Sequence, residues 1–185
     1  MNNRNHALSI FLIIGLSLVL SLCPLLPVRY SRACLPGEEP SAGTAVEDAR
    51  LTQALVAEGN GTVTQHYGFS PLWGWQDQIL VAAAEGTEIL AARPGTVVFV
   101  GEIGKDSGFA RAPFGYGLVL RHDDGLLSVY AHCKQVLVEE GQRIAAGEPL
   151  ASVKKPEEEN QGPYFLFRLQ DEKNNSLPPS LLLRH

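Results

Sequence analysis

The sequence predicts an all-β, mainly antiparallel sandwich-like domain over residues 61–180, behind one N-terminal membrane segment. Short β-branched or apolar runs begin at Thr62 and continue almost to the end of the chain. They are separated by turns rich in Gly, Pro and acidic residues, such as EEG, RPG and DDG. No helical pattern of convincing length interrupts these runs. Many short, closely spaced strands are typical of antiparallel sandwiches and barrels.

The composition suits one domain with an acidic body. The chain has 185 residues, of which 45% are hydrophobic, with 18 Gly and 12 Pro. Its formal net charge is −5, and residues 1–33 carry three Arg and no acid, so the remainder carries −5 − 3 = −8. Nucleic-acid surfaces need clustered Lys and Arg. The acidic body therefore argues against a nucleic-acid partner.

The N-terminal segment, residues 1–33, has two interpretations. Residues 7–28 are uncharged and apolar, and their length reaches the roughly 20 residues that cross a bilayer as a helix. Ser31-Arg32-Ala33 fits the small-x-small rule for signal-peptide cleavage, which would give a domain secreted after cleavage near Ala33. The long basic stretch after the apolar core suits an uncleaved signal anchor better. We expect a single-pass cell-membrane protein with an extracytoplasmic domain.

Residues 34–60 predict a linker with one short helix at 46–57, where Leu51 and Leu55 lie one turn apart. Residues 181–185 are expected to form a C-terminal tail. Between these segments the alternation predicts nine strands, at 62–67, 78–83, 87–92, 95–101, 116–122, 126–132, 134–138, 148–153 and 163–169.

The stretch VLVEEGQRIAAGEPLASV (136–153) has two Gly-centred turns, at Gly141 and Gly147. This pattern folds two strands across one another in a hammerhead-like layer, which biotin and lipoyl carrier domains also use. A carrier needs a lysine at the tip of a tight hairpin. Lys154-Lys155 instead runs into Pro156 and an acidic stretch, which disfavours a carrier function.

Three further motifs resemble a known family in their order and spacing. They are AAAEGTEILAARPGTVVFV (82–100), GYGLVLRHDDGLLSVYAHC (115–133) and GPYFLFRL (162–169). Together with the hammerhead they resemble the lysostaphin-type (LytM-like) zinc endopeptidases that cut peptidoglycan cross-links. The resemblance covers most of residues 61–179 and implies the duplicated hybrid motif of that fold. The WGWQ stretch (73–76) and the short anchor resemble, more weakly, stage II sporulation protein Q.

The resemblance implies a zinc site that this chain has lost. Active members hold one zinc ion through an early His-x-x-x-Asp and the last histidine of a late His-x-His, which leaves a fourth position for water. The three ligand positions fall on Gln76, Leu80 and Leu166. The other histidine of the late pair falls on Tyr164, and only His132, at the end of the Tyr-Ala-His strand, remains. We therefore expect no metal cofactor, and His132 and Tyr164 as vestigial catalytic residues.

The former site is expected to be a groove that binds rather than cuts. Trp73, Trp75, Tyr164 and Phe165 could stack on a peptide or glycan, or they could fill the core. The segment 102–115, which carries Arg111, is a candidate for recognition because loops on rigid scaffolds often bind. His122, in the HDDG turn, is expected to lie in a solvated hairpin.

Besides a structural or carrier-like domain, whose function the fold would not indicate, two functions remain open. The first is a membrane-tethered, catalytically inactive peptidase-like domain in cell-wall or sporulation-related binding or scaffolding, with peptidoglycan or an extracytoplasmic or membrane protein as its partner. The alternative is an active zinc metalloendopeptidase that cleaves peptidoglycan cross-link peptides through unrecognised ligands. Cys34 and Cys133 could pair in an oxidising compartment, or both thiols could stay unpaired, with Cys133 buried.

Overall fold

The computed structural model describes residues 42–57, 60–72, 74–109, 114–155 and 162–183. All of them belong to one compact unit, residues 40–185. The apolar stretch 7–28 lies outside the described residues. Among the residues that are described, no helix has both the length and the hydropathy needed to cross a membrane.

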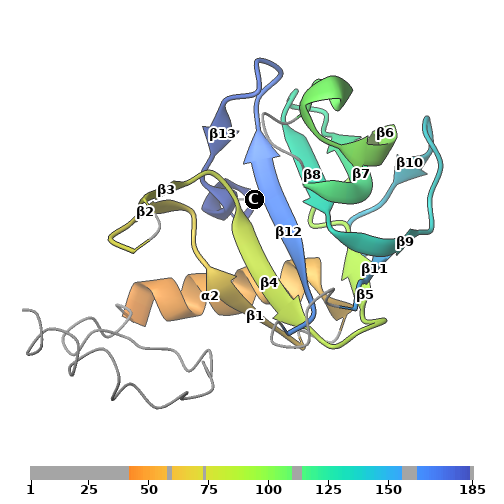
Figure 1. Ribbon diagram of the computed structural model, residues 1–185. Coiled ribbons are helices and arrows are strands. Elements are labelled where there is room, and N and C mark those ends of the chain that lie inside the picture. The colour runs from red at the N-terminus through yellow and green to blue at the C-terminus, as the bar shows by residue number, and fades with distance from the viewer. Residues whose placement is uncertain (1–41, 58–59, 73, 110–113, 156–161, 184–185) are drawn as a thin grey trace, which may run out of the picture. The chain divides into compact units, whose positions relative to one another are not determined.

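One eight-stranded antiparallel sheet dominates the fold (Figure 1). Its strand order is β1-β4-β12-β8-β7-β6-β10, and β13 pairs with β12. The strands are β1 (Gly61–Gln65), β4 (Ile79–Ala83), β6 (Gly95–Ile103), β7 (Gly115–Arg121), β8 (Leu127–Ala131), β10 (Arg143–Ile144), β12 (Tyr164–Gln170) and β13 (Ser176–Leu177).

Two smaller sheets accompany it. A three-stranded sheet has the order β5-β11-β9, from β5 (Glu88–Leu90), β11 (Pro149–Val153) and β9 (Cys133–Val136). A hairpin of β2 (Gly68–Ser70) and β3 (Gly74–Gln76) forms the third. A short 3₁₀ turn, η2 (Lys105–Ser107), follows β6, and another, η3 (Pro179–Leu183), ends the described chain.

All nine predicted strands are present, each within a few residues of its predicted bounds. The sequence missed β2, β3, β10 and β13, which are two or three residues long. A period-two pattern cannot be recognised over so few residues.

The predicted short helix is α2 (Ala42–Leu55), and it packs onto the domain rather than standing in a linker. Leu51 and Leu55 are buried in the main core, and Val56 forms a bridge with Ile89 of β5. Leu182, predicted in the tail, is also buried there, in η3. The domain's core therefore extends into both flanking segments.

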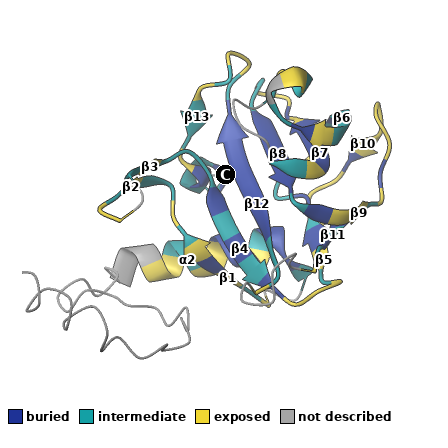
Figure 2. Cartoon of the chain, in the orientation of Figure 1, coloured by how far each residue is buried: buried dark blue, intermediate teal, exposed yellow. Residues whose placement is uncertain are grey.

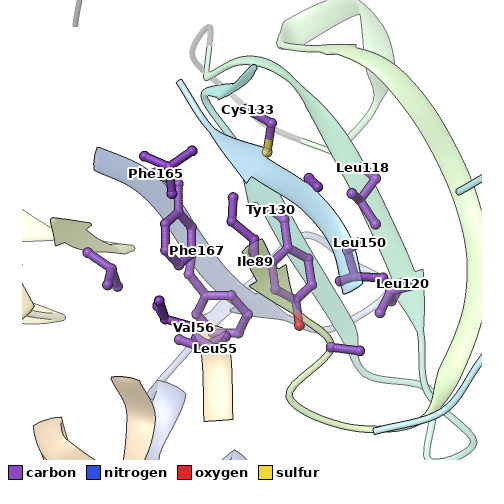
Figure 3. Close-up of a cluster of buried hydrophobic side chains, with 14 of the residues drawn as sticks. Leu55, Val56, Ile89, Leu118, Leu120, Tyr130, Cys133, Leu150, Phe165 and Phe167 are labelled. Atoms are coloured by element: carbon purple, nitrogen blue, oxygen red, sulfur yellow. The ribbon is translucent and has the colours of Figure 1, made fainter. Parts of the chain in front are cut away.

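Apolar side chains fill both faces of the large sheet. The main cluster lies between the sheets and includes Tyr130, Phe165 and Phe167, with Leu55 from α2 (Figure 3). A second cluster packs on the other face, around Val129 and Leu166. Strand β12 is therefore buried over almost its whole length, as the dark blue ribbon in Figure 2 shows.

The predicted hammerhead turns are confirmed. Gly141 and Gly147 adopt φ angles of 85° and 77°, a left-handed conformation that glycine reaches without strain. Their amide groups donate hydrogen bonds to the carbonyl oxygens of Val97 and Ala91, each at 2.8 Å. These bonds fasten the segment between β9 and β11 against β6 and the end of β5.

Candidate functional site

Two of the positions that the resemblance assigned to metal ligands lie side by side in the large sheet. Leu80 on β4 is directly opposite Leu166 on β12, and Leu166 is directly opposite Ala131 on β8. On its other side Leu80 pairs with Gln65 of β1. Residues directly opposite in an antiparallel sheet point to the same face, with Cβ atoms about 4.5–5.5 Å apart. Gln65, Leu80, Leu166 and Ala131 therefore form one row across that face.

The third former ligand position joins this row through a side-chain contact. Gln76 ends β3, and its Oε1 accepts a hydrogen bond from Gln65 Nε2. Gln65 could not be predicted to lie at the site, because nothing in its own segment marks it; only the register of β1 against β4 brings it there. The structure thus brings together all three positions that the resemblance assigned to metal ligands.

His132 and Tyr164, the two residues expected to be vestigial catalytic residues, contact each other beside the row. His132 directly follows β8 and has φ 61°, in the left-handed region. Its ring stacks on the ring of Tyr164, with centroids 4.4 Å apart and an interplanar angle of 6°. Tyr164 lies two residues before Leu166 on β12 and shares its face. Both rings are half-buried. The pair offers an imidazole and a phenol beside an apolar floor.

That floor is a packed apolar layer. Leu166 is only 7% exposed and belongs to the second cluster, against which Leu80, Phe109 and Phe114 pack. Backbone and side-chain bonds hold the segment after β6 in place: Phe114 N donates to Ile103 O at 2.7 Å, and Asn174 Nδ2 donates to Gly108 O at 2.6 Å. Phe109 and Phe114, which belong to the segment 102–115 that was a candidate for recognition, therefore cover the cluster.

The residues present do not fit a zinc ion. Zinc in proteins takes three or four sulfur, nitrogen or oxygen ligands. Leu80 and Leu166 carry no donor atom, and His132 offers a single nitrogen to the site. Within the ranges that the structure describes, no three His, Cys, Asp or Glu side chains are grouped so that they could hold a metal ion.

The structure places two of the aromatic residues that could either stack in the groove or fill the core, and only Phe165 departs from its assignment to the groove. Phe165, predicted to line the groove, is fully buried in the main core because alternation along β12 turns it away from Tyr164 and Leu166. Trp75 does not fill the core: it is 65% exposed on β3, with the ring of Tyr67 edge-on at 5.8 Å. Trp73 and Arg111, the remaining predicted groove residues, lie outside the described residues.

His122 also needs correction, because it is buried rather than solvated. Its Nδ1 lies 2.8 Å from the carbonyl oxygen of Pro94, and its Nε2 lies 2.7 Å from Ser128 Oγ. Burial lowers the pKa of the imidazole, which favours the neutral ring. Ser128 and Tyr130 alternate on the face opposite Leu166, so this histidine supports the fold and lies on the other side of the sheet from Leu80 and Leu166.

Arg168 is a buried cation that the sequence analysis missed. It lies on β12, two residues after Leu166, and is 2% exposed. Its Nη1 lies 3.0 Å from Asp77 Oδ2, and its Nη2 donates to Asn174 O at 3.0 Å. Its guanidinium carbon lies 5.9 Å from the ring centroid of Phe114. The ion pair with Asp77 links β12 to the residue after Gln76.

Comparison with known proteins finds a matching family, similar sequences and similar folds. The profile of peptidase family M23 matches residues 75–178. Murein hydrolase activator NlpD of Salmonella dublin is 29% identical over 141 residues, which cover 75% of this chain and 34% of that protein. Outer membrane antigenic lipoprotein B of Histophilus somni is 33% identical over 102 residues, or 54% of this chain and 27% of that protein. The chain thus spans about a third or less of the length of these relatives.

Solved structures share the fold. A mutant catalytic domain of the prophage-encoded M23 protein EnpA from Enterococcus faecalis is 26% identical, with a TM-score of 0.52, and the match covers 64% of this chain and 88% of that one. The catalytic domain of lysostaphin from Staphylococcus simulans is 20% identical, with a TM-score of 0.55 over 68% of this chain and 94% of that one. A chain in a structure of the SpoIIQ–SpoIIIAH pore forming complex is 18% identical, with a TM-score of 0.54. The match covers 70% of this chain and 87% of that one. The profile of peptidase family M23 matches more than half of the length of this chain, which establishes that the chain belongs to that family.

Proposed function

We propose that this M23-family domain is a catalytically inactive binding domain of the cell envelope, which acts on the wall through a murein hydrolase. One observation carries the proposal: the positions expected to hold zinc are Gln76, Leu80 and Leu166. The two leucines are neighbours across β4 and β12 inside a packed apolar layer. Aliphatic carbon cannot coordinate a cation, and hydrolysis in this family depends on a metal-bound water.

The relatives support a regulatory role near the wall. The NlpD proteins of Salmonella and Escherichia coli are described as murein hydrolase activators. The SpoIIQ structure, which shares only the fold, is described within a pore forming complex with SpoIIIAH. Both descriptions favour a domain that binds a protein partner or wall peptide over one that cleaves.

The stacked pair of His132 and Tyr164 is the polar contact that the site can offer such a partner. An imidazole and a phenol present hydrogen-bonding atoms, and Tyr164 lies on the same face of β12 as Leu166, which is opposite Leu80. A binding site of this kind combines an apolar surface with a few polar groups that fix orientation. A peptide segment with an apolar side chain and free backbone amides fits it.

We also propose that residues 7–28 hold the domain at the cell membrane, with the domain outside the cytoplasm. The length of this apolar stretch supports a membrane segment. The description of a relative as an outer membrane lipoprotein supports an envelope location. Membrane fractionation, with the mass of the mature N-terminus, tests it: a soluble product beginning after Ala33 would show release by cleavage instead.

Reconstitution tests the proposed function. Detergent-purified full chain is mixed with dye-labelled murein sacculi, with and without a murein amidase, and released dye is measured. We expect no release by the chain alone and increased release with the amidase. A variant with His132→Ala and Tyr164→Ala should lose the increase, while Leu137→Ala, at an exposed site outside the row, should keep it.

The same assay can contradict the proposal. If the chain alone releases wall peptides, and a chelator abolishes this release, the domain is an active zinc endopeptidase. If no amidase is stimulated and wild-type chain and groove variant behave alike, the groove has no role in activation.

A further inference from the structure

The β2–β3 hairpin carries a concentrated group of exposed apolar side chains. Phe69 and Trp75 are directly opposite each other across the hairpin and are 74% and 65% exposed. Leu72, in the turn between the strands, is 70% exposed. These three are half of the six large hydrophobic residues that are exposed in the described part of the chain. Single exposed apolar residues are ordinary, but a contiguous group marks an interaction surface.

The base of the hairpin is fixed, so its apolar side chains project from a firm support. The ring of Tyr67 lies edge-on to Trp75, with centroids 5.8 Å apart. Tyr67 Oη donates a hydrogen bond to the carbonyl oxygen of Ser176 on β13, at 3.2 Å. Because opposite residues share a face, Phe69 and Trp75 present one apolar surface on the two-stranded ribbon.

The chemistry of the hairpin fits the interfacial region of a lipid bilayer. Residues 67–76, YGFSPLWGWQ, contain no Asp, Glu, Lys, Arg or His, although residues 34–185 carry a net charge of −8. Both tryptophans of the chain, Trp73 and Trp75, lie in this stretch. Tryptophan and tyrosine are enriched at membrane–water interfaces because their rings are apolar with one polar atom.

The hairpin lies at the end of the domain where the chain enters from the apolar segment. His66, at its base, has Nε2 2.7 Å from Asp48 Oδ2, and Asp48 lies in the second turn of α2. Figure 1 shows the hairpin beside the N-terminal part of α2. Residues 29–41 join α2 to the apolar stretch, and 13 residues reach at most about 45 Å. A bilayer that holds residues 7–28 is therefore within reach of the hairpin.

We infer that Phe69, Leu72 and Trp75 enter the interface of the bilayer that holds residues 7–28. The inference rests on the membrane tether proposed above. A tether alone leaves a domain free to rotate, whereas a second, interfacial contact limits its orientation to the membrane. The hairpin thus restricts how the domain can rotate at the membrane surface.

Tryptophan fluorescence tests this contact directly. Full chain carrying Trp73→Phe, so that Trp75 is the single tryptophan, is reconstituted into phosphatidylcholine vesicles. We expect a blue-shifted emission, quenching by brominated phosphatidylcholine and weak quenching by iodide. Adding Phe69→Ser and Leu72→Ser should raise the iodide quenching constant at least about twofold, because the apolar area that enters the interface is lost. Leu137→Ser, at a 50% exposed leucine after β9, is the matched control and should change nothing.

The outcomes separate the tether from the hairpin. A chain that floats with the vesicles while Trp75 stays open to iodide and insensitive to brominated lipid overturns the hairpin contact alone. A chain that does not float overturns the tether and the contact together. If iodide cannot quench Trp75 and brominated lipid cannot quench it either, the hairpin packs against protein and not against lipid. That result also overturns the inference. Circular dichroism of each variant confirms that the fold is unchanged.

Discussion

Truncating Leu166 tests whether the former metal position now stabilises the fold. Leu166 is 7% exposed, lies opposite Leu80 and Ala131, and belongs to the second apolar cluster. A buried Leu→Ala change costs about 2–5 kcal/mol through lost transfer free energy and a residual cavity. We take the lower part of that range, about 2–3 kcal/mol, because the neighbouring Leu80 is only half-buried and can partly fill the space.

The expected shift is large enough to measure by thermal melting. For a domain of about 150 residues, 1 kcal/mol corresponds to about 2–4 °C, so Leu166→Ala should lower the melting temperature by roughly 5–10 °C. Leu80→Ala should cost less, about 1–2 kcal/mol, because part of its surface already meets water. A double-mutant cycle should give a coupling of about 0.2–1 kcal/mol, as for other cross-strand pairs.

Urea unfolding gives the loss of unfolding free energy in Leu166→Ala. Measuring it both with chelator and with added zinc shows whether a metal ion contributes to stability. The wild-type chain should melt identically in the two conditions. A Leu166→Ala change smaller than about 0.5 kcal/mol would show that the side chain lies in an open groove, as a surface residue does. If added zinc raised the urea midpoint of the wild-type chain, the chain would bind zinc, and the interpretation of Leu80 and Leu166 as a packed apolar layer would be wrong.

Four further predictions concern residues around the site. Burial lowers the pKa of His122, so below pH 6.5 the unfolded chain binds a proton that the folded chain resists. The free energy of unfolding should therefore fall as pH drops from 6.5 through the pKa of the folded state. In urea unfolding, His122→Gln should make this pH dependence weaker, and an unchanged pH dependence would contradict the prediction. Asp77→Asn should cost about 1–3 kcal/mol, because Arg168 is buried and loses its carboxylate; a neutral result would refute the importance of the pair. Burial raises the pKa of the free Cys133 thiol to about 12. The thiol should therefore react with Ellman's reagent only after unfolding, and a rapid reaction in the folded protein would show that it is accessible. Leu80→Asp alone should restore no wall-peptide cleavage in zinc, since two ligands are still missing, and turnover would contradict the ligand placement.

The strands could be predicted because period-two alternation and turn residues are local properties of the sequence. The same alternation explains the error at Phe165. The resemblance marked Tyr164 and Leu166 as groove positions, and Phe165 was grouped with them as an aromatic although it lies on the other face of β12. Strict alternation of side chains along β12 would have placed Phe165 in the core.

The polar interior could not be predicted because it depends on pairing between distant segments. His122 is buried because Pro94 and Ser128 provide a carbonyl and a hydroxyl for its two ring nitrogens. Arg168 is buried because Asp77 and Asn174 reach it from other segments. Neither set of partners is visible from the local sequence. A charged residue in the middle of an otherwise apolar strand, as Arg168 is, was the available signal.

Metal analysis of the purified full chain shows whether the positions of Gln76, Leu80 and Leu166 hold a zinc ion. After exposure to excess zinc and removal of free ion, we expect far less than one zinc per chain and no change in melting temperature. One tightly held zinc per chain, bound by three protein donors at the row of Gln76, Leu80 and Leu166, would contradict this expectation.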